Sequence, residues 1–130
     1  METLFRPCMV GAGGCISSVL RYLVSGWVQD RSGSIAFPFG TVSVNLSGCF
    51  AIGLLSWLVE TRSLFSPETR AFLLIGLLGG FTTFSTFGNE TLSLLRNSRV
   101  EMAMLYTAVH VIAGVGMVWA GRLVAFGIWR

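Results

Sequence analysis

Residues 79–87 read Gly-Gly-Phe-Thr-Thr-Phe-Ser-Thr-Phe, in the middle of an otherwise apolar segment. Two adjacent glycines are unfavourable inside a helix, and four of the five residues from Thr82 to Thr86 carry hydroxyls that compete for backbone hydrogen bonds. Together with the flanking residues 73–78 and 87–95, the segment is long enough to cross a membrane. We predict a transmembrane helix that is broken at its centre, where protein or water must satisfy the irregular backbone.

The composition indicates an integral membrane protein. Of the 130 residues, 53% are hydrophobic and 12% are charged, whereas about a quarter are charged in ordinary soluble domains. A monomer in water would expose too much apolar surface with this composition. The net charge of +3 comes from arginines that are scattered singly. This pattern argues against nucleic acid as a partner, because phosphate binding needs a basic stripe.

The apolar segments predict an all-α fold with a single domain, residues 1–130, of four transmembrane helices. The second segment would be about 31 Å long at 1.5 Å per residue, which is enough to cross the hydrocarbon core. Ser66 and Pro67 fit an N-cap and a first helical residue before the third segment. We expect a turn at Asp30–Ser34 and helices at residues 4–28, 39–59, 72–95 with a break near 79–85, and 102–129.

The positive charges divide almost evenly between the two membrane sides. One side would hold Arg6, Arg62, Arg70, Arg122 and Arg130. The other side would hold Arg31, Arg96 and Arg99. Because orientation by positive charge needs a clear excess, either the protein inserts both ways or other features orient it. Small residues on the first and fourth spans favour oligomerisation, so an antiparallel, dual-topology homodimer satisfies both observations.

The residues that are most costly to place inside the predicted spans are Arg21, Asn45, Glu90 and His110. Such residues are functional candidates because lipid cannot solvate them. Arg21 lies near the end of its span, where it either extends to the headgroups or contacts a ligand. Asn45 shares a helical face with Thr41 and Gly48, and its amide either bonds a neighbouring helix or donates to an anion.

Phe84 and Phe87 would project to one face of a helix that resumes after the break. Aromatic pairs in membranes usually pack, but their positive ring edges can also line the path of a dehydrated anion. Thr83 and Thr86 add hydroxyl donors nearby. Glu90 continues the face, and a carboxylate there repels an anion unless it is protonated or held by a donor. These residues alone leave the sign of a transported ion open.

Tyr106, His110 and Gly114 share a face of the fourth span. A lone histidine on an apolar helix is more often a packing residue than a ligand, and the chain has no second His or Cys at metal-binding spacing. The three cysteines, Cys8, Cys15 and Cys49, also form no CxxC motif. Ser85, Glu90 and His110 lack the nucleophile elbow of a hydrolase. We therefore expect neither a transition-metal site nor an enzyme.

The motifs Gly-Thr-Val-Ser-Val-Asn-Leu-Ser-Gly at residues 40–48 and Gly-Gly-Phe-Thr-Thr-Phe-Ser-Thr-Phe at residues 79–87, followed by Glu90, resemble those of the CrcB/Fluc fluoride channels. The glycine-rich run that ends in Arg21-Tyr22 is similar to the first span of that family. The resemblance covers the full chain. This chain departs from it at Gly88 and Gly114, where many members have serine.

The resemblance implies an antiparallel homodimer in the bacterial inner membrane, whose two pores passively export fluoride from the cytoplasm and relieve its toxicity. It also implies a structural Na⁺ at the dimer centre, held by the backbone carbonyls of Gly79 and Thr82 from each subunit. Arg21 would lie at the aqueous vestibule. The fluoride pore would be lined by Thr41, Asn45, Thr83, Phe84, Ser85, Thr86, Phe87, Glu90, Tyr106 and His110.

Two other classes of protein remain as alternatives. A proton-coupled exporter of small cations would need a central intramembrane carboxylate, for which Glu90 is the candidate. A membrane enzyme or assembly factor is disfavoured because the intramembrane polar groups are few and mostly neutral. Passive anion flux without a pH gradient distinguishes a channel from the exporter.

Overall fold

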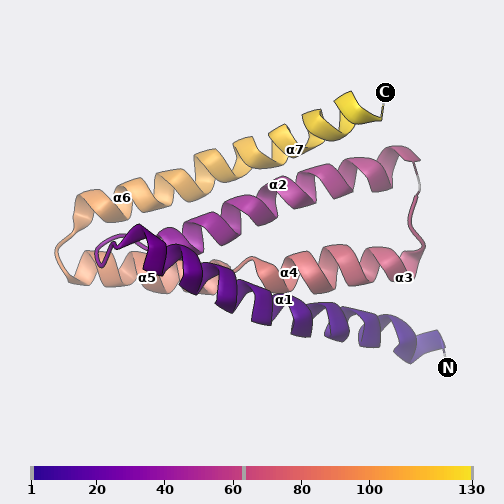
Figure 1. Cartoon of the computed structure of the whole chain (residues 1–130), viewed down its shortest axis with the longest axis horizontal. Coiled ribbons are helices and arrows are strands. Elements are labelled where there is room, and N and C mark those ends of the chain that lie inside the picture. Colours follow the sequence, from indigo (N-terminus) through magenta and orange to yellow (C-terminus); the bar gives the residue numbers. More distant parts are fainter. Residues whose placement is uncertain (1, 63, 130) are drawn as a thin grey trace.

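The computed structural model describes residues 2–62 and 64–129, and every regular element among them is a helix (Figure 1). Arg130, which entered the charge comparison, lies outside the described residues. Four helical segments are long and apolar enough to cross a membrane: Leu4–Ser32, Phe39–Arg62, Pro67–Arg96 and Val100–Ile128. The prediction of an all-helical protein with four candidate spans is confirmed.

The first span is a single helix, α1 (Glu2–Ser32), which continues past the expected end at Val28. It stops where Gly33 adopts a positive φ of 62°, a conformation that glycine takes without a steric penalty. Of the expected turn at Asp30–Ser34, residues 30–32 are therefore still helical, and the chain leaves the helix at Gly33. The chain then bends into the second span, α2 (Phe39–Arg62).

Gln29 fixes this bend by hydrogen bonds in both directions. Its amide nitrogen donates to the carbonyls of Ser34 and Phe37, at 2.5 and 3.2 Å. Its Oε1 accepts from the backbone N–H of Gly40 at 3.1 Å, in the first turn of α2. One side chain thereby joins the end of α1, the connecting loop and the start of α2.

The third span is made of four short elements: α3 (Pro67–Arg70), the π-helical segment η1 (Ala71–Leu78), α4 (Gly79–Phe81) and α5 (Phe84–Arg96). The predicted cap is confirmed, because Ser66 Oγ accepts from the Thr69 N–H at 3.2 Å and Pro67 begins the helix. Thr82 and Thr83, between α4 and α5, both have extended backbone.

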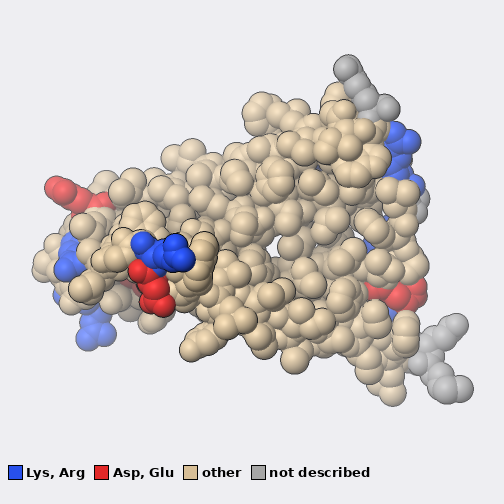
Figure 2. Space-filling model, in the orientation of Figure 1, with Lys and Arg blue, Asp and Glu red and all other residues tan. Residues whose placement is uncertain are grey.

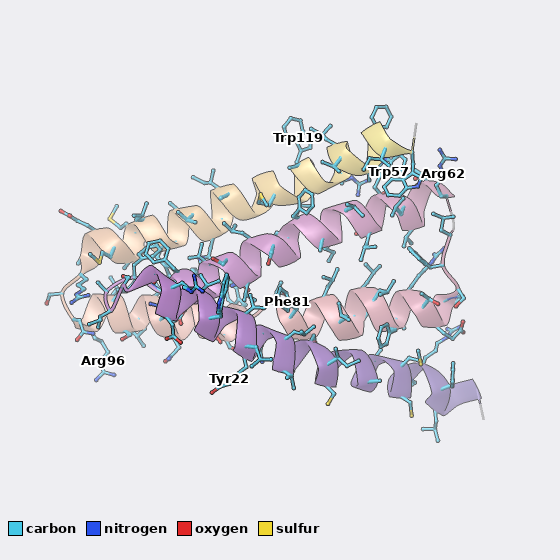
Figure 3. All side chains as sticks on the ribbon, viewed as in Figure 1. Tyr22, Trp57, Arg62, Phe81, Arg96 and Trp119 are labelled. Atoms are coloured by element: carbon cyan, nitrogen blue, oxygen red, sulfur yellow. The ribbon has the colours of Figure 1, made fainter. Side chains whose placement is uncertain are left out.

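The fourth span comprises α6 (Val100–Ala108), the π-helical segment η2 (Val109–Ala113) and α7 (Gly114–Ile128). Figure 1 shows this span alongside α2, while α1 crosses beside η1 and α4. Charged side chains gather toward the two ends in the view of Figure 2, and the surface between them is uncharged. Arg62 and Arg96 mark opposite ends in Figure 3, while Trp119 and Tyr22 point outward from the bundle. This distribution suits a lipid environment.

Glycines allow α2 and α7 to approach closely. A Cβ added to Gly53 would overlap the backbone carbonyl of Val118, and one added to Gly121 would overlap that of Phe50. Small residues at helix contacts are the main way in which membrane helices increase their van der Waals contact, because lipid gives no hydrophobic drive for helices to associate. The contact between α2 and α7 therefore depends on the absence of side chains at these two positions.

We predict that Gly53→Ala destabilises the protein by about 1–3 kcal/mol, because the added methyl must push α2 away from α7. Gly116→Ala is the matched control on α7, since nothing lies within 4 Å of the position of its added Cβ. Unfolding of the two purified variants in the same detergent measures the difference. Equal stability of the two variants would contradict the close contact.

Candidate functional site

The site is centred on the extended backbone of Thr82 and Thr83, which Asn45 of α2 holds in place. Asn45 Oδ1 accepts from the Thr83 N–H at 2.9 Å, and Asn45 Nδ2 donates to the Thr83 carbonyl at 3.2 Å. Asn45 is buried, so both backbone groups of Thr83 are paired where water is scarce. Of the two hydrogens on Nδ2, one is used in this contact and the second is left over.

The Asn45 pairing and the Thr83 hydroxyl each take an N–H that would bond a carbonyl in a continuous helix. In a continuous α-helix the N–H of residue 83 would bond the carbonyl of residue 79, but the Thr83 N–H is bound to Asn45. The N–H of residue 86 would likewise bond the carbonyl of residue 82, but the Thr86 N–H bonds Thr83 Oγ1 at 3.2 Å. Gly79 and Thr82 are thus the residues whose carbonyls lose these bonds.

Hydroxyl groups cover the start of α5. Thr83 is its N-cap, and its Oγ1 also lies 3.0 Å from Thr86 Oγ1 and 3.2 Å from Ser85 Oγ. Thr82 Oγ1 instead donates back to the Leu78 carbonyl at 3.1 Å. Thr83, Ser85 and Thr86 therefore lie together at the N-terminus of α5, whereas Thr82 bonds the preceding turn.

Glu90 is held by hydroxyls from two other helices. Thr41 Oγ1 of α2 lies 2.9 Å from Glu90 Oε1, and the Tyr106 hydroxyl of α6 lies 2.5 Å from Oε2. Tyr106 is fully buried and Thr41 is buried. Both carboxyl oxygens thus have a hydrogen-bond partner, and this contact joins α2, α5 and α6 at one point.

An aromatic cluster lies beside this carboxyl group. The Phe87 ring is 5.4 Å from Phe84, 5.5 Å from Tyr106 and 4.6 Å from His110, measured between centroids. The centroids of the Tyr106 and His110 rings are 4.4 Å apart, and the ring planes are inclined at 66°. Phe84 is 83% exposed in this single chain, so its ring forms the open edge of the cluster.

Two cavities meet at Thr83. The first, of about 550 Å³, is lined among others by Arg21, Thr41, Thr86 and Glu90, and also by Thr83. The second, of about 370 Å³, is lined among others by Gly79, Asn45, Thr82, Thr83, Phe84, Phe87 and His110. Arg21 thus lines the first cavity, on the same wall as Tyr22 and Gln29 of α1. Tyr106 lines neither cavity and instead supports residues of both.

The structure brings nearly all predicted site residues to one region, but it also shows contacts that the sequence analysis missed. Ser17 is fully buried on α1, and its Oγ lies 3.3 Å from the Gly76 carbonyl of η1. The role of Thr83 as a cap was also missed, although a hydroxyl residue directly before the helix that resumes at Phe84 is the usual signal. The contacts of Gln29 were missed as well, because Gln29 lies just after the predicted helix at residues 4–28 and belongs to no motif.

In the part of the chain that the structure describes, no three His, Cys, Asp or Glu side chains form a possible metal site. The groups that converge at the break are an amide, several hydroxyls and aromatic rings, together with a carboxyl group that already has two partners. These features define a small membrane protein with four candidate spans and a hydrogen-bonding site around the extended residues Thr82 and Thr83.

The chain belongs to the CrcB family. The model of the family described as "CrcB-like protein, Camphor Resistance (CrcB)" matches residues 8–122, which is most of the sequence. Relatives in this family are named as fluoride-specific ion channels, so the family is one of transporters rather than enzymes.

Several relatives match over almost their whole length. The chain is 41% identical over 125 residues to "Fluoride-specific ion channel FluC 3" of Methanosarcina barkeri, covering 96% of this chain and 93% of the relative. It is 43% identical over 113 residues to "Fluoride-specific ion channel FluC" of Rhizobium meliloti, covering 87% and 90%. It is 38% identical over 125 residues to the FluC protein of Flavobacterium psychrophilum, covering 96% and 98%.

We predict that Asn45→Ala destabilises the protein strongly. It leaves the Thr83 N–H and carbonyl without their partners, at about 1–3 kcal/mol for each buried group left unsatisfied. Asn89→Ala is the matched control, because Asn89 is exposed on α5. Thermal unfolding in detergent compares the variants, and an Asn45→Ala protein as stable as the control would show that the contact does not hold the break.

Proposed function

We propose that this protein is a fluoride-selective channel through which fluoride leaves the cytoplasm passively, down its gradient, so that its toxicity is reduced. The observation that carries the proposal is the Asn45 contact with Thr83. It leaves one amide hydrogen on a neutral side chain that lines the second cavity. The names of the relatives given above support fluoride as the ion.

Fluoride is small, so removing its hydration shell is costly and donors must replace the lost water. The site supplies donors of this kind without a fixed positive charge: the Asn45 amide and the hydroxyl group at the start of α5, where Thr83 Oγ1 donates to Thr86 Oγ1 and leaves the Thr86 hydroxyl hydrogen available. The rings of Phe84 and Phe87 add positive edges along the second cavity. Arg21, in the first cavity, would draw anions toward the vestibule.

Glu90 must be compatible with an anion path for this proposal to hold. Its two oxygens are engaged by the hydroxyls of Thr41 and Tyr106. A carboxyl group held by two donors has fewer free lone pairs directed into the path, and its position is fixed by α2 and α6. The same engagement disfavours the alternative of a cation exporter, in which the carboxylate must be free to bind substrate and proton in turn.

We further propose that two copies assemble as an antiparallel homodimer with two pores, in the bacterial inner membrane. The near-even distribution of arginines supports insertion in both orientations. Gly79, at the interruption near the middle of the Pro67–Arg96 span, is exposed in the single chain. An exposed break at the middle of a span needs a protein neighbour, and a second copy of the same segment supplies one.

We also propose a structural Na⁺ between two such breaks. The carbonyls of Gly79 and Thr82 lose their helical partners for the reasons given above, and hard cations prefer oxygen ligands. In the dimer these two residues from each copy would hold the ion. The ion would stabilise the crossing of the two third spans by neutralising the carbonyl ends of both α4 helices.

Fluoride efflux from proteoliposomes tests the channel. We expect electrode-detected efflux that needs no pH gradient and is much faster than chloride efflux. Asn45→Asp and Phe84→Ile should reduce efflux to that of protein-free liposomes, because one adds a negative charge and the other removes a ring edge. Phe5→Ile, at an exposed position on α1, is the matched control and should keep the wild-type rate. Wild-type rates in both pore variants would refute these roles, and proton-driven uptake of an organic cation would favour the exporter.

Cross-linking tests the dimer. In a background in which Cys8, Cys15 and Cys49 are serine, we expect Gly79→Cys to form a disulfide-linked dimer on mild oxidation, because cross-linked Cα atoms must lie within about 7 Å. Gly116→Cys is the control and should remain monomeric on a denaturing gel. The wild-type protein should also unfold at a higher temperature in sodium chloride than in choline chloride. A monomeric Gly79→Cys protein would count against the antiparallel dimer, and equal melting in both salts against the cation.

A further inference from the structure

Ser17 of α1 is fully buried against the third span, close to the break. Its Oγ lies 3.3 Å from the Gly76 carbonyl of η1 and 3.1 Å from the Gly14 carbonyl of its own helix. The fluoride path proposed above does not use this hydroxyl, which lines neither of the two cavities that meet at Thr83. A polar side chain buried this completely in an apolar span calls for a reason.

The carbonyl of Gly76 lies where the third span changes its hydrogen-bond pattern. At the end of η1 the Gly79 N–H is shared between the carbonyls of Leu74 and Gly76. The Thr82 N–H instead bonds the carbonyl four residues back, as in an ordinary α-helix, at 3.1 Å. The two N–H groups in between therefore face three carbonyls, those of residues 75–77. One carbonyl has no N–H to itself, and the Ser17 hydroxyl meets the one at Gly76.

The hydroxyl hydrogen of Ser17 is directed to Gly76 because the alternative acceptor is already occupied. Within α1 the Gly14 carbonyl bonds the N–H four residues on, and the Ser18 hydroxyl donates to the same carbonyl at 2.7 Å. A carbonyl oxygen has two lone pairs, so both are taken. Ser17 thus donates across the helix contact, from α1 to η1, whereas Ser18 donates within α1.

The Ser17 side chain also packs against Gly80, in α4. A Cβ added to Gly80 would overlap Ser17 Oγ and would lie 3.1 Å from Gly14 Cα. Gly79, the residue before Gly80, is exposed in the single chain. Ser17 therefore contacts the third span at residue 76 and at residue 80, on both sides of the glycine whose carbonyl is proposed to hold Na⁺.

We propose that Ser17 is a positioning residue of the sodium site, which holds α4 so that the carbonyls of Gly79 and Thr82 meet the ion. This inference rests on the proposed function, because the ion belongs to the proposed dimer. The helix α4 is three residues long, so its own hydrogen bonds fix it weakly. Partners outside the ligand shell orient the ligands of a metal ion, and a site that is correctly arranged for only part of the time binds more weakly by that fraction.

Sodium binding, measured through unfolding, tests this role. The unfolding temperature of each purified protein is followed along a series in which sodium chloride replaces choline chloride at constant total salt. Its rise gives the apparent dissociation constant of sodium. For Ser17→Ala, which keeps a small buried side chain without the hydroxyl, we expect this constant to increase about fivefold or more. Ser18→Ala is the matched control and should keep the wild-type constant, because the Ser18 hydroxyl bonds within α1.

Stability without sodium separates this role from simple packing. If Ser17 only packed α1 against η1, Ser17→Ala would lower the unfolding temperature in choline chloride and leave the sodium constant unchanged. That result would overturn the proposal, as would an equal increase of the constant in Ser18→Ala. A wild-type protein whose unfolding does not respond to sodium would overturn both this inference and the proposed cation site. Fluoride efflux by the same preparation then decides whether the channel itself stands.

Discussion

The pair of hydrogen bonds between Asn45 and Thr83 is the interaction on which the rest of the site depends. Extended backbone inside an apolar span is unstable unless each N–H and carbonyl finds a partner. One amide side chain supplies both partners to Thr83, across 38 positions of sequence. Because Thr83 is fixed, α5 begins at a defined residue, and Phe84 and Phe87 take their places one turn apart.

Glu90 has a comparable role on the opposite side of Phe87. Its contacts with Thr41 and Tyr106 tie α5 to α2 and α6, so the helix that starts at the break is held at both ends of its functional face. Phe87 packs on Tyr106, whose hydroxyl bonds the same carboxyl group. The aromatic rings and the hydroxyl cap are thus positioned by two long-range polar contacts rather than by the helix alone.

Local rules accounted for much of this arrangement. Four apolar segments predicted four spans, Ser66 and Pro67 predicted a cap, and residues 79–87 directed attention to the region where the backbone is extended. The partners across the bundle could not be predicted, because periodicity gives the face of a residue but not the helix opposite it. The end of α1 was missed because Asp30 and Arg31 look like a polar turn, while the residue that stops the helix is Gly33. No local signal predicted that Gln29 would join the loop to α2.

The break also has opposite electrostatic character on its two sides. The last turn of a helix presents carbonyl oxygens and the first turn presents N–H groups, so the end of α4 is negative and the start of α5 is positive. The bonds made by Asn45 and by Thr83 Oγ1 leave the carbonyls of Gly79 and Thr82 on the negative side. Amide and hydroxyl donors surround the positive side. In the proposed channel this polarity would favour the proposed cation at residues 79–82 and the proposed anion from Phe84 onward, without an additional charged side chain.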